Sequence, residues 1–240
     1  MVIIRDEKKI ARLRQVGMWA NFVGLGVLIA GLILPLIIQN DQILIFQVLA
    51  IPVGWLLSQV GIYYTHRFVR DPRPDEVLDE SLRKVARNGR LYHYVLPAPH
   101  VLLTPAGIII LVAKYQVGNV SYANGRWQQR GVSAVRRLFS QEGLGNPTAE
   151  AQRDIQKLVK FLKKHAPQVE EVPVGAMIVF TTKNGGELDV KDAPLPTMHA
   201  AKLKGVFKQT TQGAPLPAAD YQALQAAFDR SAGKLVAVAA

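Results

Sequence analysis

The sequence predicts a two-helix transmembrane hairpin followed by an α/β domain with a mixed sheet. Two long, uncharged apolar runs lie near the N-terminus of the 240-residue chain. After them, short apolar runs typical of strands alternate with amphipathic segments typical of helices. Roughly 175 residues follow the two runs, which is enough for one domain with a well-packed core.

The hairpin prediction rests on residues 17–38 and 43–64, two runs of 22 residues without a charged side chain. A bilayer core about 30 Å thick needs about 20 helical residues to cross it. The linker 39–42 permits only a tight turn between antiparallel helices. A cleaved signal peptide fits poorly, because its apolar region spans only about 7–15 residues. Two core helices of a soluble protein also fit poorly, because both runs are apolar on every face.

The distribution of basic residues predicts how this hairpin is oriented. All 29 Lys and Arg residues lie outside residues 15–66. The positive-inside rule therefore predicts a multi-pass protein of the cell membrane with both termini in the cytoplasm. Three aromatic residues fit an aromatic belt on that side: Trp19, Tyr63 and Tyr64. Three glycines either allow close helix packing or simply face lipid: Gly24, Gly26 and Gly31.

These patterns divide the chain into five parts. We expect a basic cytoplasmic N-terminus (residues 1–16), the transmembrane hairpin (17–65) and a Pro-rich linker (66–75). The α/β domain (76–232) and a flexible tail (233–240) follow.

Local signals place the elements of the α/β domain. Asn124-Gly125 predicts the turn of a hairpin with arms at 118–122 and 126–129. Asn146-Pro147 suits the start of a helix that runs to about residue 164. The remaining strands are expected at 91–97, 100–104, 108–113, 174–182 and 187–190, and the remaining helices at 74–87, near 199–207 and near 218–230.

Composition narrows the possible chemistry. The chain has no cysteine, which excludes disulfides, thiolate metal sites and Cys nucleophiles. Its formal net charge of +11 suits an anionic partner, but membrane topology alone gives the same sign. The sequence contains no P-loop, dinucleotide fingerprint, zinc-protease or serine-hydrolase motif. The loop Gly143-Leu144-Gly145 either presents a helix start to an anion or is a flexible joint.

The block HVLLTPAGIIILVAK at 100–114, followed by a hairpin containing Gly-Arg-Trp, resembles the core of the NERD (nuclease-related) domain. The later Gly-Asn-Pro with its amphipathic helix, and then VGAMIVFTT, follow that domain's order. The resemblance covers about residues 74–209 and is carried by Gly107, Lys114, Gly118, Trp127 and Asn146-Pro147. NERD domains are placed in the PD-(D/E)-x-K nuclease superfamily and often accompany membrane spans. The resemblance thus implies a restriction-endonuclease-like fold.

That superfamily holds Mg²⁺ with an Asp on one strand and with Glu/Asp-x-Lys on the next. Here Lys114 is present, but Val112 takes the place of the Glu, and the place of the Asp falls near His100. The family's Gln after Asn-Pro falls on Glu150. No Asp or Glu occurs between Ser81 and Gln141, where nine Lys or Arg occur. The remaining carboxylates that could contribute are Glu76, Asp79, Glu80, Glu142 and Glu150.

We therefore expect a nuclease-like fold without metal ligands, in which Lys114 is a vestigial catalytic candidate and His100 a weak one. The preferred function is a membrane-anchored, non-catalytic NERD-like domain that binds nucleic acid or another anionic partner at the cytoplasmic membrane face. Trp127 would stack a base, while phosphates would contact Arg126, Arg130, Arg136 and Arg137.

Two other functions stay open. A membrane-surface or protein-assembly module would turn its basic residues toward anionic lipid headgroups. An active nuclease with a rearranged site would need Mg²⁺, whereas the other two functions need no cofactor. The charge also fits topology and solubility alone, and the oligomeric state is not specified by the sequence.

Overall fold

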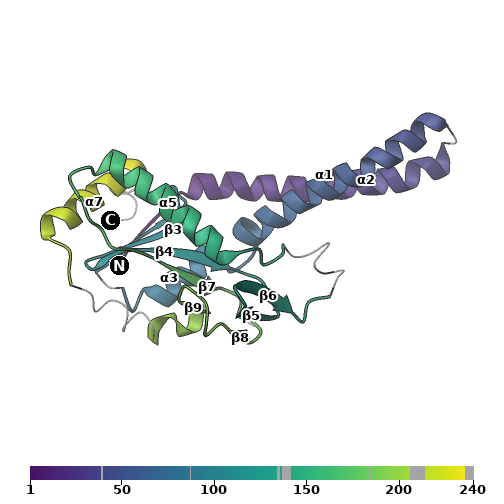
Figure 1. The fold of residues 1–240 in the computed structure, drawn as a ribbon. Coiled ribbons are helices and arrows are strands. Elements are labelled where there is room, and N and C mark those ends of the chain that lie inside the picture. The colour runs from purple at the N-terminus through teal and green to yellow at the C-terminus, as the bar shows by residue number, and fades with distance from the viewer. Residues whose placement is uncertain are drawn as a thin grey trace. The chain divides into compact units, whose positions relative to one another are not determined.

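The computed structural model describes residues 1–38, 40–86, 88–133, 136, 142–183, 185–205 and 214–235. The chain forms two compact units, which we call the α/β unit and the helical unit. The α/β unit comprises Met1–Glu7, Pro74–Val132 and Leu144–Ala240, and the helical unit comprises Lys8–Arg73 and Ser133–Gly143. Figure 1 confirms the predicted architecture, two N-terminal apolar helices followed by an α/β domain with a mixed sheet.

The two helices are long and apolar enough to cross a membrane. Helix α1 spans Glu7–Ile37, helix α2 spans Asp41–Tyr64, and a π-helical turn, η1, continues α2 over Thr65–Val69. The Asn40 side chain caps α2 by accepting from the Gln42 backbone N–H at 3.0 Å. Large apolar side chains along both helices are exposed, for example Leu36 at 77%. Such a continuous apolar surface is costly in water but suits lipid.

Close packing between α1 and α2 depends on glycines spaced seven residues apart. Gly17, Gly24 and Gly31 are the glycines that α1 buries. A Cβ added at Gly24 would lie 2.9 Å from the Ser58 amide nitrogen, and one at Gly31 would lie 2.6 Å from the Ala50 Cβ. Nothing lies within 4 Å of a Cβ added at Gly26. The close-packing alternative therefore holds for Gly24 and Gly31 and does not hold for Gly26.

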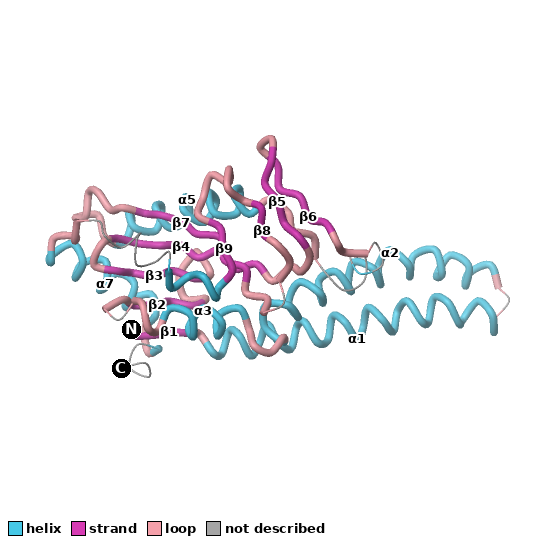
Figure 2. The backbone as a smooth tube through the Cα atoms, turned by 90° about the horizontal axis from the view of Figure 1, so that it is seen from below, coloured by secondary structure: helices cyan, strands magenta, loops and turns pink. Residues whose placement is uncertain are grey.

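The main sheet of the α/β unit has six strands in the order β1-β2-β3-β4-β7-β9. Its antiparallel pairs are β2 with β3 and β3 with β4, and its parallel pairs are β1 with β2, β4 with β7 and β7 with β9. Figure 2 shows these strands side by side. Their bounds are Val2–Arg5, Arg90–His93, His100–Thr104, Gly107–Lys114, Val174–Phe180 and Thr197–His199.

Helices cover both faces of this sheet (Figure 1). Helices α5 (Pro147–His165) and α7 (Ala218–Ala232) pack on one face, where Leu158 and Phe228 join the core around Ile110 and Val112. Helix α3 (Pro74–Leu82) and the 3₁₀ turn η2 (Ala200–Lys202) pack on the other. We call these the α5 face and the α3 face. Alternating side chains of β4 enter the two cores, which explains its continuous apolar run.

A small second sheet has the order β6-β5-β8, with bounds Arg126–Arg130, Asn119–Ala123 and Leu188–Asp189. The turn between β5 and β6 has positive φ at both Asn124 and Gly125. That conformation is the type I′ pattern which Asn-Gly favours, so the predicted hairpin is confirmed.

Several elements differ from the sequence prediction. Residues 2–5, where the sequence predicts no strand, form β1 beside β2, and α1 begins at Glu7. Local patterns miss β1, because its partner strand begins only at Arg90. Helix α3 ends at Leu82 rather than at 87. His199 ends strand β9 and also caps the 3₁₀ turn η2, so the helical segment expected near 199–207 begins at Ala200.

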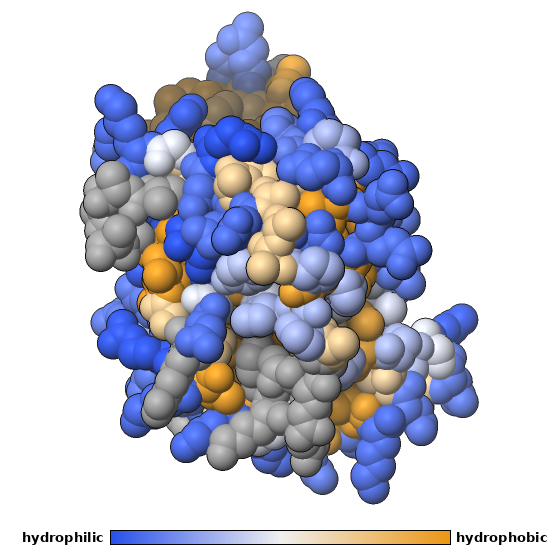
Figure 3. Space-filling model, turned by 90° about the vertical axis from the view of Figure 1, so that its left-hand side faces the viewer, coloured by the Kyte–Doolittle hydropathy of each residue, from blue (hydrophilic) through white to orange (hydrophobic). Residues whose placement is uncertain are grey.

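A polar contact ties α7 to β2. The Arg90 guanidinium donates to both carboxylate oxygens of Asp229 at 2.9 and 2.8 Å, and the Tyr92 hydroxyl donates to the same carboxylate at 2.8 Å. Burial raises the pKa of Tyr92 well above its ordinary value. Figure 3 shows mostly hydrophilic side chains on the face of the molecule turned toward the viewer.

The glycine contacts predict how the hairpin tolerates larger side chains. Gly24→Leu should lower the thermal stability of the helical unit, by about 1–3 kcal/mol of overpacking, because its side chain would meet the α2 backbone. Gly26→Leu, the matched control on the same helix, should leave stability nearly unchanged. Far-ultraviolet circular dichroism of the full chain in detergent during heating measures both. Equal melting temperatures for the two variants would refute the close-packing assignment.

Candidate functional site

The motif lysine ends strand β4 on the α5 face of the sheet. Lys114 pairs in register with Phe180 of the parallel strand β7. Because side chains alternate along a strand, Lys114 points to the same face as Val112 two residues earlier. The lysine side chain is buried, with 4% of its surface exposed. A buried ammonium needs polar partners to remain charged.

Helix α5 and the loop before it supply these partners. The Lys114 ammonium lies 2.6 Å from Glu150 Oε1 and donates to the Leu144 carbonyl at 3.1 Å. Glu150 sits in the first turn of α5, where the Asn146 side chain caps the helix by accepting from the Ala149 amide at 3.1 Å. The N-cap thus holds the carboxylate at a defined position beside the lysine.

The place of the motif glutamate is apolar core. Val112 is 6% exposed and packs in the same core cluster as Leu158 of α5. Among the residues that the structure describes, no group of three or more His, Cys, Asp or Glu is arranged to hold a metal ion. The residues of the motif therefore assemble an ion pair around Lys114, with a valine where the superfamily places a carboxylate.

His100 lies on the opposite, α3 face of the sheet. Its Nδ1 is 2.8 Å from the Nδ1 of His93 on the neighbouring strand β2. His93 Nε2 in turn lies 2.9 Å from Asp79 on α3. Both histidines are buried. The sheet thus separates His100 from Lys114, and the structure does not bring the two candidate catalytic residues together.

Arg5 of β1 completes this polar cluster. Its guanidinium is ion-paired with Asp79 and lies 2.9 Å from the fully buried Asp75. Burial alone would lower the pKa of Arg5, but the two carboxylates outweigh it and raise that pKa above its ordinary value. Sequence reasoning counted Arg5 only as a positive-inside residue. Its only local signal was an acidic pair, Asp75 and Asp79, on one face of α3.

Strand β6 carries three of the predicted nucleic-acid-binding residues. Arg126 and Arg130 are exposed and share one face of the strand with exposed Gln128. Trp127 points to the other face, where its indole N–H donates to the Thr148 hydroxyl at 2.9 Å and its ring packs edge-on against Tyr122. The structure thus brings the two arginines together and uses Trp127 partly as a core contact.

The other two predicted contacts lie elsewhere. Arg136 is exposed and belongs to the helical unit. Arg137 lies outside the described residues.

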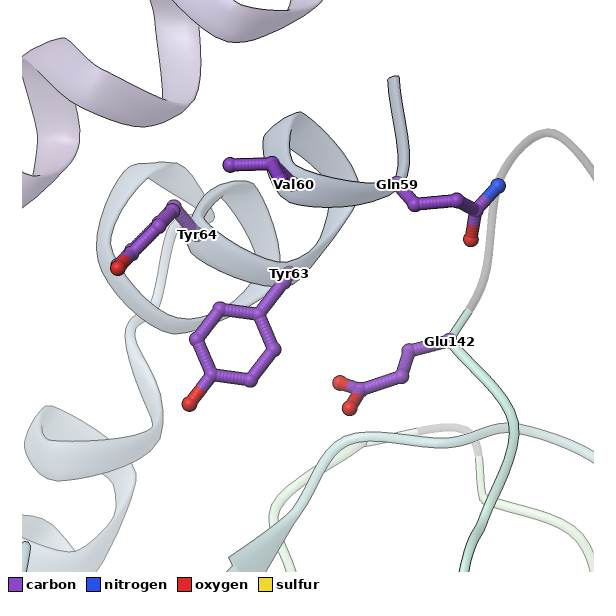
Figure 4. A pocket seen from close by; sticks show the side chains of 5 residues that line it. All are labelled: Gln59, Val60, Tyr63, Tyr64 and Glu142. Atoms are coloured by element: carbon purple, nitrogen blue, oxygen red, sulfur yellow. The ribbon is translucent and has the colours of Figure 1, made fainter. Parts of the chain in front are cut away.

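Glu142, which the sequence analysis names as a possible metal ligand, is ion-paired within the helical unit. Its Oε2 accepts from Arg67 at 2.7 Å, and Arg67 also stacks over the Tyr63 ring at 3.7 Å. Figure 4 shows Glu142 beside Tyr63, at a pocket of about 440 Å³. Glu76 and Glu80 lie on α3, on the face of the sheet opposite Lys114.

Removing one partner of the lysine pair should destabilise the fold. Glu150→Ala should lower the free energy of unfolding by about 1–3 kcal/mol, less than a fully buried pair, because Glu150 is partly exposed. Adding Lys114→Met should restore most of that loss, because no buried charge then remains. Urea unfolding of the full chain in detergent, followed by tryptophan fluorescence, measures both. The exposed Gln156→Ala serves as control, and a double variant as unstable as Glu150→Ala would contradict the prediction.

Comparison with known proteins agrees with the motif. No curated protein and no solved structure matches the chain. Residues 76–181 match the family model of the nuclease-related domain, NERD. This segment runs from α3 through β7 and contains Lys114, Val112 and Glu150. The mixed sheet and the position of Lys114 agree with this similarity of residues 76–181 to the nuclease-related (NERD) domain.

Proposed function

We propose that this chain is a membrane-anchored NERD-domain protein that does not cleave nucleic acid but binds it, or another anionic partner, through the exposed face of β6. The observation that carries the proposal is the Lys114 ammonium, which is buried and ion-paired with Glu150 beside the apolar Val112. A lysine used in this way serves the fold rather than a reacting phosphate.

The residues around Lys114 do not suit the magnesium of the superfamily. Mg²⁺ requires several oxygen ligands in near-octahedral geometry, usually including one or two carboxylates. Glu150 is the carboxylate in contact with the lysine, and its charge is balanced by the ammonium. A divalent cation at this place would have to displace that ammonium and would then be left beside valine.

Charge and exposure support binding through β6. The segment between Ser81 and Gln141 holds nine basic residues and no acidic one. Arg126 and Arg130 are exposed and four residues apart on one strand, a separation of about 13 Å, or about four base-pair steps of a duplex. Arginine is suited to phosphate because its fork donates two parallel hydrogen bonds.

The position of β1 supports a transmembrane hairpin whose two ends lie on the same side of the membrane. Strand β1 precedes α1, and β2 follows α2, yet the two strands pair in one sheet. The chain must therefore enter and leave a bilayer from the same side, which requires an even number of crossings. Basic residues flank both ends of the helices, whereas the turn between them has none, and this distribution supports our proposal that both ends face the cytoplasm.

Salt dependence tests the binding proposal. The full chain in phosphatidylcholine nanodiscs should bind a short fluorescein-labelled single DNA strand with an affinity that falls steeply as salt rises. Arg126→Ala/Arg130→Ala should weaken binding and reduce the slope of log affinity against log salt by about 1.4, two contacts at about 0.7 each. Fluorescence anisotropy across a salt series gives both quantities.

The lysine pair Arg126→Lys/Arg130→Lys is the matched control and should keep the slope, because charge alone sets it. Binding that is absent, or insensitive to salt, would overturn the proposal. Binding to anionic vesicles that a DNA competitor leaves unchanged would favour a membrane-surface module instead.

A cleavage assay tests the non-catalytic part. The full chain is incubated with single- and double-stranded DNA and RNA in the presence of Mg²⁺. We expect the unaltered chain to yield no more cleavage products than the Lys114→Ala variant does. Gel separation of labelled substrates measures the products, and Glu150→Gln separates loss of charge from loss of packing. Mg²⁺-dependent cleavage that both variants remove would show that the site is active.

A further inference from the structure

A pocket of about 600 Å³ opens on the α3 side of the main sheet, where strands β7 and β9 end. Its walls come from α3, from the residues after β7 and from η2 with the residues that follow. Carboxyl ends of parallel strands are where open α/β sheets usually bind ligands. The volume lies within the range of small-molecule sites, about 300–1,000 Å³.

Lysines dominate the charge of this pocket. Lys84 comes from the turn after α3, Lys183 from the loop after β7, and Lys202 and Lys204 from the segment after β9. One carboxylate, Glu80, lines the pocket with them, so the formal charge of these five side chains is +3. Basic side chains as far apart in sequence as Lys84 and Lys204 thus line one cavity. A polyanion is the ligand that this charge favours.

The rest of the lining is apolar or fixed in place. Val77, Glu80 and Ser81 follow helical spacing and present one face of α3 to the pocket. The Thr182 hydroxyl donates to the Tyr115 carbonyl at 2.6 Å, which anchors the strand end.

His199 is held as well. Its Nε2 lies 3.0 Å from the Gly186 carbonyl, and its ring packs edge-on against Phe180. Since a carbonyl only accepts, Nε2 carries the proton that it donates. A rigid frame of this kind costs less ordering when a ligand binds.

We propose that this pocket binds a small organic phosphate, with the phosphate among the lysines and the organic body against the apolar lining residues Val77, Phe180, Ala200 and Ala201. Lysine binds phosphate as a point charge, and four lysines suit a diphosphate or a polyphosphate better than a monoester. The site shares no residue with β6 or with the Lys114 ion pair, which lies on the α5 face. It is therefore independent of the nucleic-acid proposal.

Calorimetric titration of the full chain in phosphatidylcholine nanodiscs tests this site with three probes. ADP represents a nucleoside phosphate, inositol trisphosphate represents a lipid headgroup, and inorganic pyrophosphate lacks an organic body. At least one organic phosphate should bind more tightly than pyrophosphate, and the tighter of the two identifies its source. Lys183→Ala/Lys202→Ala should weaken that binding about tenfold or more.

Two controls separate the pocket from general surface charge. Lys160→Ala/Lys163→Ala, on the exposed side of α5, removes the same charge and should change affinity less than about twofold. Ala201→Trp fills the pocket without changing charge and should also weaken binding, while circular dichroism confirms the fold.

Three results would overturn the proposal. They are no binding of either organic phosphate at millimolar concentration, equal binding of pyrophosphate, and full affinity in either pocket variant. DNA binding through β6 should persist in all these variants, so failure here is distinguishable from failure of that proposal.

Discussion

Arg5 provides the contact on which the arrangement of the α/β unit depends. It lies at the end of β1, and its guanidinium reaches Asp75 and Asp79 on α3, two elements that flank the helical hairpin in sequence. The α/β unit is thus a domain with the hairpin inserted after its first strand. Because Asp75 is fully buried, loss of the arginine would leave a carboxylate charge without its ion-pair partner, a costly change in a protein interior. Sheet pairing and this ion pair together keep both ends of the hairpin in one domain.

The main sheet divides the polar groups of the α/β unit between its two faces. On the α5 face, Lys114 and Glu150 form an ion pair where the nuclease superfamily keeps a metal site. On the α3 face lie the buried histidines and the lysine-lined pocket. The lysine of the motif therefore lies on one face, while the open, charged cavity lies on the other. A fold can host a ligand at either face, so function has to be argued from the site and not from the fold.

Elements with strong local signals could be predicted from the sequence, and elements defined by distant partners could not. The β-branched run of β4, the Asn-Gly turn and the Asn-Pro start of α5 all appear where the residues indicate. Strand β1 has four residues and is stabilised by pairing with β2, so no local pattern reveals it. His199 lies in a segment with helical composition, yet it pairs with Phe180 of β7 as the last residue of β9.

The same distinction explains what could be predicted of the candidate site. The absence of acidic residues between Ser81 and Gln141 follows directly from the sequence, and so does the apolar residue at position 112. That Glu150 neutralises Lys114 required knowledge of how α5 packs, because 36 residues separate them. Trp127 shows where a prediction from sequence pattern can mislead. An aromatic residue between arginines suits base stacking, but side chains alternate along β6, so the Trp127 ring lies on the face opposite Arg126 and Arg130. Any nucleic acid on that face would be held through arginine and Gln128, whose amide can contact phosphate or sugar without reading a base.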